Sequence, residues 1–114
     1  MKIWRCNDGN GSPLGWGFEC PGCGDSHVVY TENVPHRPNW GFNGSVDKPT
    51  FTPSILVRGT KPLTDAEIDR VCGGEKIDPI PRVCHSFVAD GRIQFLGDCT
   101  HALAGQTVDL PDVV

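Results

Sequence analysis

The sequence has no apolar run that approaches the roughly 18 residues needed to cross a bilayer. Its N-terminus also lacks the roughly 7–15-residue apolar segment of a signal peptide, so we expect a cytosolic protein without membrane contact. An excess of positive charge is missing as well, since 10 Lys and Arg residues face 14 Asp and Glu residues, for a net charge of −4. Nucleic acid is therefore not an expected partner, because its phosphates would have no basic surface to meet.

Apolar residues are few for a chain of this length. They make up 38% of the 114 residues, and the length leaves room for one domain, residues 1–114, with one core. Glycine and proline are abundant instead, with 14 and 10 copies, so turns and short strands should dominate. We predict a mainly β, small α+β fold with one or two short helices, stabilised by a cross-link in addition to its core.

The six cysteines could supply that cross-link. In a reducing cytosol, cysteines are more often metal ligands or buried thiols than disulfides. A zinc knuckle is predicted by the run Cys20-Pro21-Gly22-Cys23-Gly24, because a tight turn between two cysteines brings both sulfurs to one point. A redox dithiol is the alternative for this pair, but no βαβ pattern surrounds it.

A second pair of ligands is expected at the open end of a hairpin. Two strand-like runs, 83–88 and 92–96, flank Asp90-Gly91, which favours a type I′ turn. That register brings Cys84 close to Cys99, and the predicted zinc ligands are therefore Cys20, Cys23, Cys84 and Cys99. In a competing set, His85 or His101 replaces one or both later cysteines, although His85 should point away from Cys84 on a strand. The remaining Cys6 and Cys72 read as small buried hydrophobes.

Two further elements frame these motifs. A short helix is predicted after Thr64, which can form a capping box with Glu67, and it should stop at Gly73 and pack on the sheet. The run 49–58 is expected to be an edge strand, or a strand that begins at Ser54, because Pro53 lacks a backbone donor. Asp98 can cap a single helical turn over residues 99–104.

Four zinc-bound cysteines would leave the metal no open position, so chemistry would need other groups. The polar residues near the proposed site could supply a nucleophile, a base and an orienting carboxylate: they are Ser54, His85, Ser86, Asp98 and His101. Taken singly, each also has a structural explanation as a cap, a strand hydroxyl or a satisfied histidine.

Four segments of the chain resemble a family of small zinc-binding proteins of tailed phages and prophages, formally a domain of unknown function. These segments are 18–24, 49–55, 84–88 and 98–108. Distant relatives occur in bacterial operons that resemble ubiquitin conjugation systems, where a peptidase acting on the ubiquitin-like modifier is proposed. The resemblance implies a hydrolase, with Ser54 as nucleophile and His85 or His101 as base.

Three hypotheses follow for the function. The first is a zinc-stabilised peptidase that acts on a protein or ubiquitin-like tail. The second is a non-catalytic zinc module that binds a protein through Trp40, Phe42 or its proline-rich segment. The third is direct zinc hydrolysis, which needs three protein ligands and a water.

Overall fold

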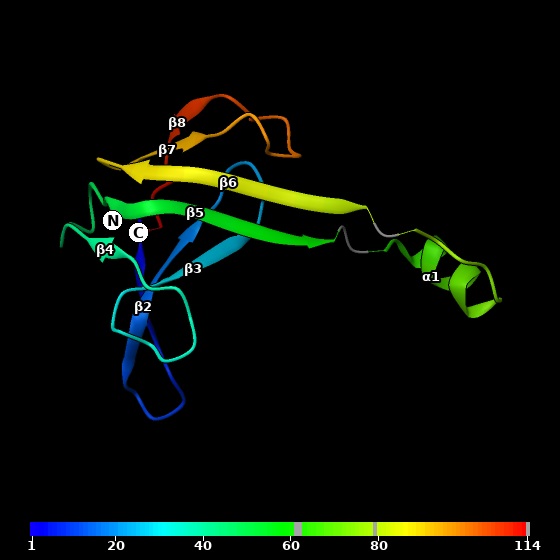
Figure 1. The fold of residues 1–114 in the computed structure, drawn as a ribbon, viewed down its shortest axis with the longest axis horizontal. Coiled ribbons are helices and arrows are strands. Elements are labelled where there is room, and N and C mark those ends of the chain that lie inside the picture. Colours follow the sequence, from blue (N-terminus) through cyan, green and yellow to red (C-terminus); the bar gives the residue numbers. More distant parts are fainter. Residues whose placement is uncertain (61–62, 79, 114) are drawn as a thin grey trace.

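The computed structural model describes residues 1–60, 63–78 and 80–113. Its strands form two antiparallel sheets, which confirms the mainly β prediction (Figure 1). The first sheet has the order β1-β2-β3, with strands Trp4–Asn7, Pro13–Glu19 and Ser26–Tyr30. The second has the order β4-β5-β6-β7-β8, with strands Gly41–Phe42, Phe51–Thr60, Pro81–Ala89, Arg92–Phe95 and Thr107–Asp109.

The hairpin of β6 and β7 has the predicted register. Ala89 pairs with Arg92 across the turn. The two turn residues, Asp90 and Gly91, have φ angles of 54° and 79°, the positive values that a type I′ turn requires. One face of this hairpin is buried, and it consists of Cys84, Ser86, Ile93 and Phe95.

The core lies where the two sheets face each other. Phe18 and Val29 come from β2 and β3, and Phe51 and Phe95 from β5 and β7; all four are almost fully buried. The same cluster includes Cys20 and Cys84, whose thiols are free and buried. The chemistry-bearing cysteines thus sit at the seam between the sheets.

Strand β5 begins at Phe51 and continues through Pro53, so it does not start at Ser54. Phe51 pairs with Val88 and Ile55 pairs with Ser86, so β5 has three residues between these pairs where β6 has one. A proline is tolerated in such an irregular stretch because no ladder donor is needed there. Because of this irregularity, Ser54 is not part of the regular β5–β6 ladder, and its side chain need not point in the direction that a regular strand would give it.

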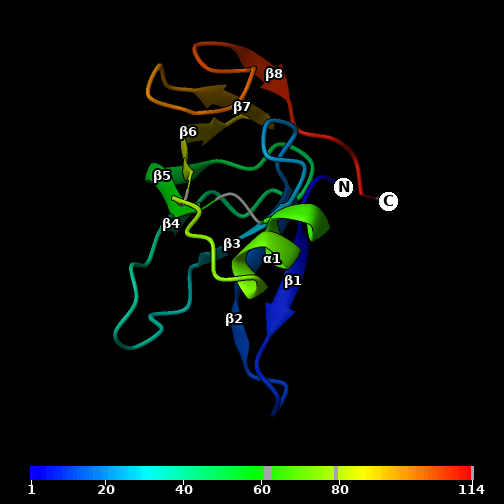
Figure 2. The same ribbon diagram turned by 90° about the vertical axis from the view of Figure 1, so that its right-hand side faces the viewer.

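The helix α1 (Asp65–Cys72) has the predicted capping box between Thr64 and Glu67, and it ends at Gly73. The prediction that it packs on the sheet is wrong. None of its residues is buried, and it lies beyond the far end of β5 and β6 (Figures 1 and 2). The long strands carry it past the core, which leaves Ile68 and Val71 more than two-fifths exposed.

The single helical turn expected over residues 99–104 does not form. Residues 99–104 form bends and turns instead, before Gly105 with a φ of 78°. Among the residues that the structure describes, no helix has the length and apolar character needed to cross a bilayer.

Candidate active site and metal centre

Four side chains from three parts of the chain meet at the seam between the sheets. The ligand atoms of Cys20, Cys23, Cys84 and His101 all lie within 4.8 Å of one another. Cys20 directly follows β2, Cys23 lies in the turn before β3, and Cys84 is on β6. His101 comes from the turns after β7, so this cluster joins the first sheet to the second.

The knuckle is held by its own backbone. The Gly24 N–H donates to the Cys20 carbonyl at 2.9 Å, and the Cys23 N–H donates to the Cys20 sulfur at 3.4 Å. A side chain at Gly22 would collide with the His101 ring, because a Cβ there would lie 2.3 Å from Cε1. Glycine at this position therefore lets the histidine reach the sulfurs.

The donor set fits zinc. Ligands on a tetrahedral zinc with Zn–S bonds of about 2.3 Å lie roughly 3.8 Å apart, and the sulfurs of Cys20 and Cys84 are 3.8 Å apart. Three thiols and one imidazole form one of the common structural zinc sets. Within the described residues, His101 Nε2 is buried without a hydrogen-bond partner, so the ring carries a polar atom that the surrounding protein does not satisfy.

The thiols already differ in their readiness to ionise. A hydrogen bond from Cys84 lowers the pKa of Cys20 to about 3, and His27 and the Cys23 N–H act in the same direction. The pKa of Cys84 is raised because it gives that hydrogen bond and because it is buried. Burial, and then the charge on Cys20, raise the pKa of Cys23. One thiolate is thus favoured, whereas ionisation of the other two calls for a cation.

Cys99, predicted as the fourth ligand, lies outside this cluster. Its thiol donates to the His85 carbonyl at 3.1 Å and accepts the His85 N–H at 3.2 Å. The Leu96 N–H, just after β7, also donates to the His85 carbonyl at 2.9 Å, so the Cys99 sulfur lies at the end of the β6–β7 pairing and not in the cluster. His101 occupies the fourth position instead, which is the alternative that the sequence left open.

A second constellation lies on the other face of β6. His85 Nε2 is 3.1 Å from Ser54 Oγ, and His85 Nδ1 is 3.1 Å from Asp98 Oδ2. Cys84 and His85 are neighbours on one strand, so their side chains point to opposite faces. The two sites therefore share β6 but lie back to back.

Each member of the second site owes its position to a local feature. Ser54 sits in the irregular stretch of β5, His85 is in the regular part of β6, and Asp98 lies in the loop after β7. The His85 side chain is 25% exposed and that of Asp98 is 55% exposed, so the site opens to solvent. A hydroxyl, an imidazole and a carboxylate linked in this order form the arrangement of a serine hydrolase.

The remaining predicted site residues have other surroundings. His101, considered as a base, belongs to the cysteine cluster, and Ser86 is buried in the core with 1% exposure. His27 was missed at the sequence level. It follows the knuckle on β3, is only 8% exposed and lowers the pKa of Cys20.

A model of the family described as bacterial ubiquitination-like system serine protease (BubE) matches residues 2–96. The chain belongs to this family. The BubE match includes Ser54 and His85 as well as the three clustered cysteines, whereas Asp98 and His101 lie just beyond it and are placed by geometry alone. None of the curated proteins and none of the solved structures matches the chain.

Proposed function

We propose that this BubE-family protein is a serine peptidase in which Ser54 is the nucleophile, His85 the general base and Asp98 the orienting carboxylate. The observation that supports it is the continuous chain of two 3.1 Å hydrogen bonds through both ring nitrogens of His85. A serine hydroxyl is a weak nucleophile alone, and an adjacent base that is itself oriented by a third group activates it. The family description, a serine protease of a ubiquitination-like system, agrees with this chemistry.

The reaction follows from the positions of the three groups. Ser54 Oγ attacks the carbonyl carbon of the scissile bond while its proton passes to His85 Nε2. The bond to the leaving amine then breaks as His85 returns that proton to the amine nitrogen, which leaves an ester on Ser54. Water repeats the attack with His85 as base, so that the acid product and the free hydroxyl are restored. Asp98 accepts from Nδ1–H throughout and stabilises the imidazolium form.

The proposed metal centre would serve the structure and not the reaction. Cys20, Cys23, Cys84 and His101 would hold a zinc ion with four protein ligands, and zinc supplies folding free energy in such closed sites. Its ligands come from both sheets and include the neighbour of His85. The metal would therefore hold β6, and with it the base, in place against the first sheet.

The two alternative functions find less support. Direct zinc hydrolysis needs a ligand position open to water, but four side chains converge at the cluster. A binding module would present Trp40 and Phe42, yet both pack against the core. Phe42 contacts the rings of Trp16 and Phe51, and the Trp40 indole donates to the Ser54 carbonyl.

The substrate that we propose is a protein chain, such as the tail of a ubiquitin-like modifier; the family description, which names a serine protease of a ubiquitination-like system, supports a protein substrate. A cytosolic location and an origin in a phage or prophage stay predictions from the sequence.

Labelling with a fluorophosphonate probe tests the nucleophile. We expect the wild-type protein to be labelled at Ser54 and to hydrolyse a panel of fluorogenic peptides, and Ser54→Ala to lose both while its metal content and thermal stability stay unchanged. The matched control is Ser12→Ala, at an exposed position outside the site. Labelling or turnover that persists in Ser54→Ala would refute the assignment.

A further inference from the structure

Strand β5 has a free edge that starts beside Ser54. On that side, β4 pairs only with Phe51 and Thr52, and the described part of the chain places no strand along the rest of β5. Residues 56–60 are exposed. Exposed strand edges are usually protected, because their unpaired N–H and C=O groups recruit another chain.

The register shows which backbone groups face outward. Ala89 and Arg92 flank the two-residue turn and are hydrogen-bonded to each other, so odd-numbered residues of β6 bond toward β7 and even-numbered ones toward β5. The Thr100 N–H to Val83 carbonyl bond fits this alternation. Since Arg58 lies opposite Val83, its own N–H and C=O point away from β6, and those of Leu56 do so too.

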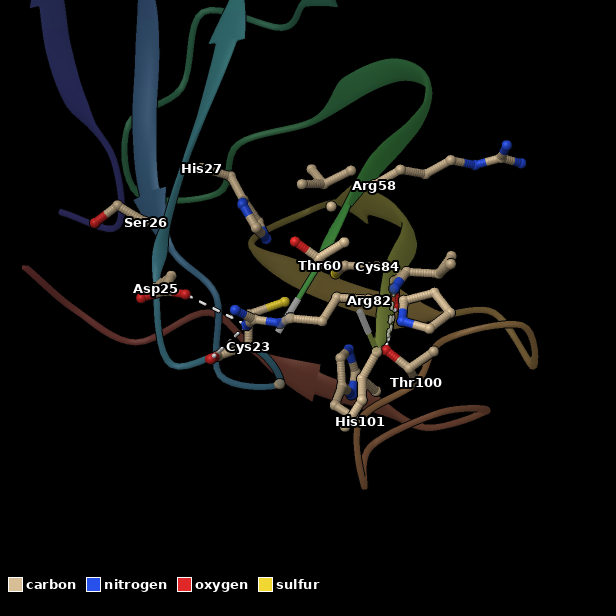
Figure 3. Close-up of a pocket in the computed structure, with 16 residues that line it drawn as sticks. Cys23, Asp25, Ser26, His27, Arg58, Thr60, Arg82, Cys84, Thr100 and His101 are labelled. Atoms are coloured by element: carbon tan, nitrogen blue, oxygen red, sulfur yellow. Dashed lines mark hydrogen bonds and ion pairs between the residues drawn. The ribbon is translucent and has the colours of Figure 1, made fainter. Parts of the chain in front are cut away.

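The same edge borders a groove of about 680 Å³ (Figure 3). Residues 57–60 of β5 form one side, and Ser26 and His27 of β3, itself the outer strand of its sheet, form another. Cys23, Cys84 and His101 of the candidate metal centre also line this groove, and the apolar side chains Val57, Ile80 and Pro81 line its part beside β5 and β6. A groove of this size is within the usual range for ligand sites, about 300–1,000 Å³.

Trp40 connects the end of β3 to β5 beside the nucleophile. Its N–H donates to the Tyr30 carbonyl at the end of β3, and its indole donates to the Ser54 carbonyl at 3.2 Å. Trp40 therefore links β3 to β5 at Ser54. Farther along β5, the groove lies between the two strands. An extended chain lying against β5 would run directly toward the Ser54 site.

We propose that the substrate binds as an added strand on the free edge of β5, pairs with the backbone of Leu56 and Arg58, and places an apolar side chain in the groove. This inference rests on the proposed peptidase function and specifies how its substrate is held. Strand addition explains why a long edge is left unprotected beside the nucleophile. Arg58 is about four residues, or roughly 13 Å, from Ser54 along an extended strand, so three to four substrate residues cover this edge.

Arg58→Pro tests the backbone pairing. Proline removes the outward N–H without removing a hydrogen bond to β6, which is the placement that edge strands tolerate. Arg58→Ala is the matched control because it removes the same side chain and keeps the donor. Using a positional-scanning library of fluorogenic peptides, we expect kcat/KM to fall about tenfold in Arg58→Pro relative to Arg58→Ala. Fluorophosphonate labelling of Ser54, which needs no extended substrate, should stay at the wild-type rate.

Gly59→Leu tests the groove independently. A Cβ at Gly59 meets no atom within 4 Å, so the leucine side chain can enter the groove without a clash with the protein. Gly9→Leu is the control, since Gly9 is equally open but lies in the remote turn between β1 and β2. We expect Gly59→Leu alone to reduce peptide cleavage at least tenfold and to weaken the preference for an apolar residue.

The outcomes separate the two proposals. Normal labelling of Ser54 together with unchanged peptide cleavage in both Arg58→Pro and Gly59→Leu overturns strand addition and leaves the peptidase intact. Equal losses of labelling and cleavage in these variants also overturn it, because the defect would then lie in the catalytic groups. Absence of labelling and cleavage in the wild-type protein overturns the peptidase function, and strand addition falls with it.

Discussion

Replacement of His101 by phenylalanine gives the sharpest test of the metal centre. His101 packs edge-on against Phe95, with ring centroids 4.4 Å apart, and its ring fills the space above Gly22. Phenylalanine keeps an aromatic ring at this position, but it removes the nitrogen ligand and also Nδ1, which accepts the Leu103 N–H at 3.2 Å. Because the ring contact with Phe95 is kept, loss of metal in His101→Phe can be separated from loss of this packing.

The expected size of the effect follows from the number of ligands. A structural zinc contributes about 10–16 kcal/mol of apparent binding free energy, so one of four ligands accounts for roughly 2.5–4 kcal/mol. That corresponds to zinc affinity weaker by roughly a hundred- to a thousandfold. Since a domain is stable by only about 5–15 kcal/mol, and the cluster joins the two sheets, the variant should also melt at a markedly lower temperature.

The assay is a competition titration against a chromogenic chelator, followed by thermal unfolding monitored by circular dichroism. Cys99→Ser is the matched control. Serine can keep both hydrogen bonds to the His85 backbone, and we expect wild-type zinc affinity. The reasoning is refuted if Cys99→Ser loses the metal while His101→Phe retains it, because the fourth ligand would then be the cysteine.

Three further results are expected. Asp98→Asn should reduce peptide cleavage roughly a hundredfold with zinc content unchanged. We expect a smaller loss than the roughly 10⁴-fold effect of a buried triad aspartate, because this carboxylate is 55% exposed. Activity equal to that of Asp90→Asn would contradict the role. Cys6→Ala and Cys72→Ala should leave the zinc content measured by mass spectrometry unchanged, since neither lies in the cluster; loss of zinc in either would identify a wrong ligand. Phe18→Ala should lower the free energy of unfolding in urea by about 3–5 kcal/mol, because the side chain is fully buried, and a loss under 1 kcal/mol would show that the two sheets do not share this core.

Much of the local structure could be read from the sequence. The Asp90-Gly91 turn sets a two-residue hairpin, which fixes the register of β6 on β7 and therefore which residues share a face with Cys84. The Thr64 capping box likewise marks where α1 begins. These features depend on residues a few positions apart, so backbone preferences and short hydrogen bonds are enough to determine them.

The sequence also indicated which residue types carry the chemistry. It predicted the knuckle of Cys20 and Cys23 and named Ser54 as a nucleophile. The alternation of side chains along a strand separates Cys84 from His85, and the structure places one in the cluster of three cysteines and His101 and the other between Ser54 and Asp98.

Only the tertiary structure decided between Cys99 and His101. They are two residues apart in a segment without regular secondary structure, where no periodicity fixes which side chain turns toward the knuckle. The outcome depends on long-range contacts, namely the edge of β6 that receives the Cys99 sulfur and the missing side chain at Gly22 that admits the His101 ring. The approach of Ser54 to His85 has the same origin, because it depends on how β5 bulges against a strand that follows 31 residues later.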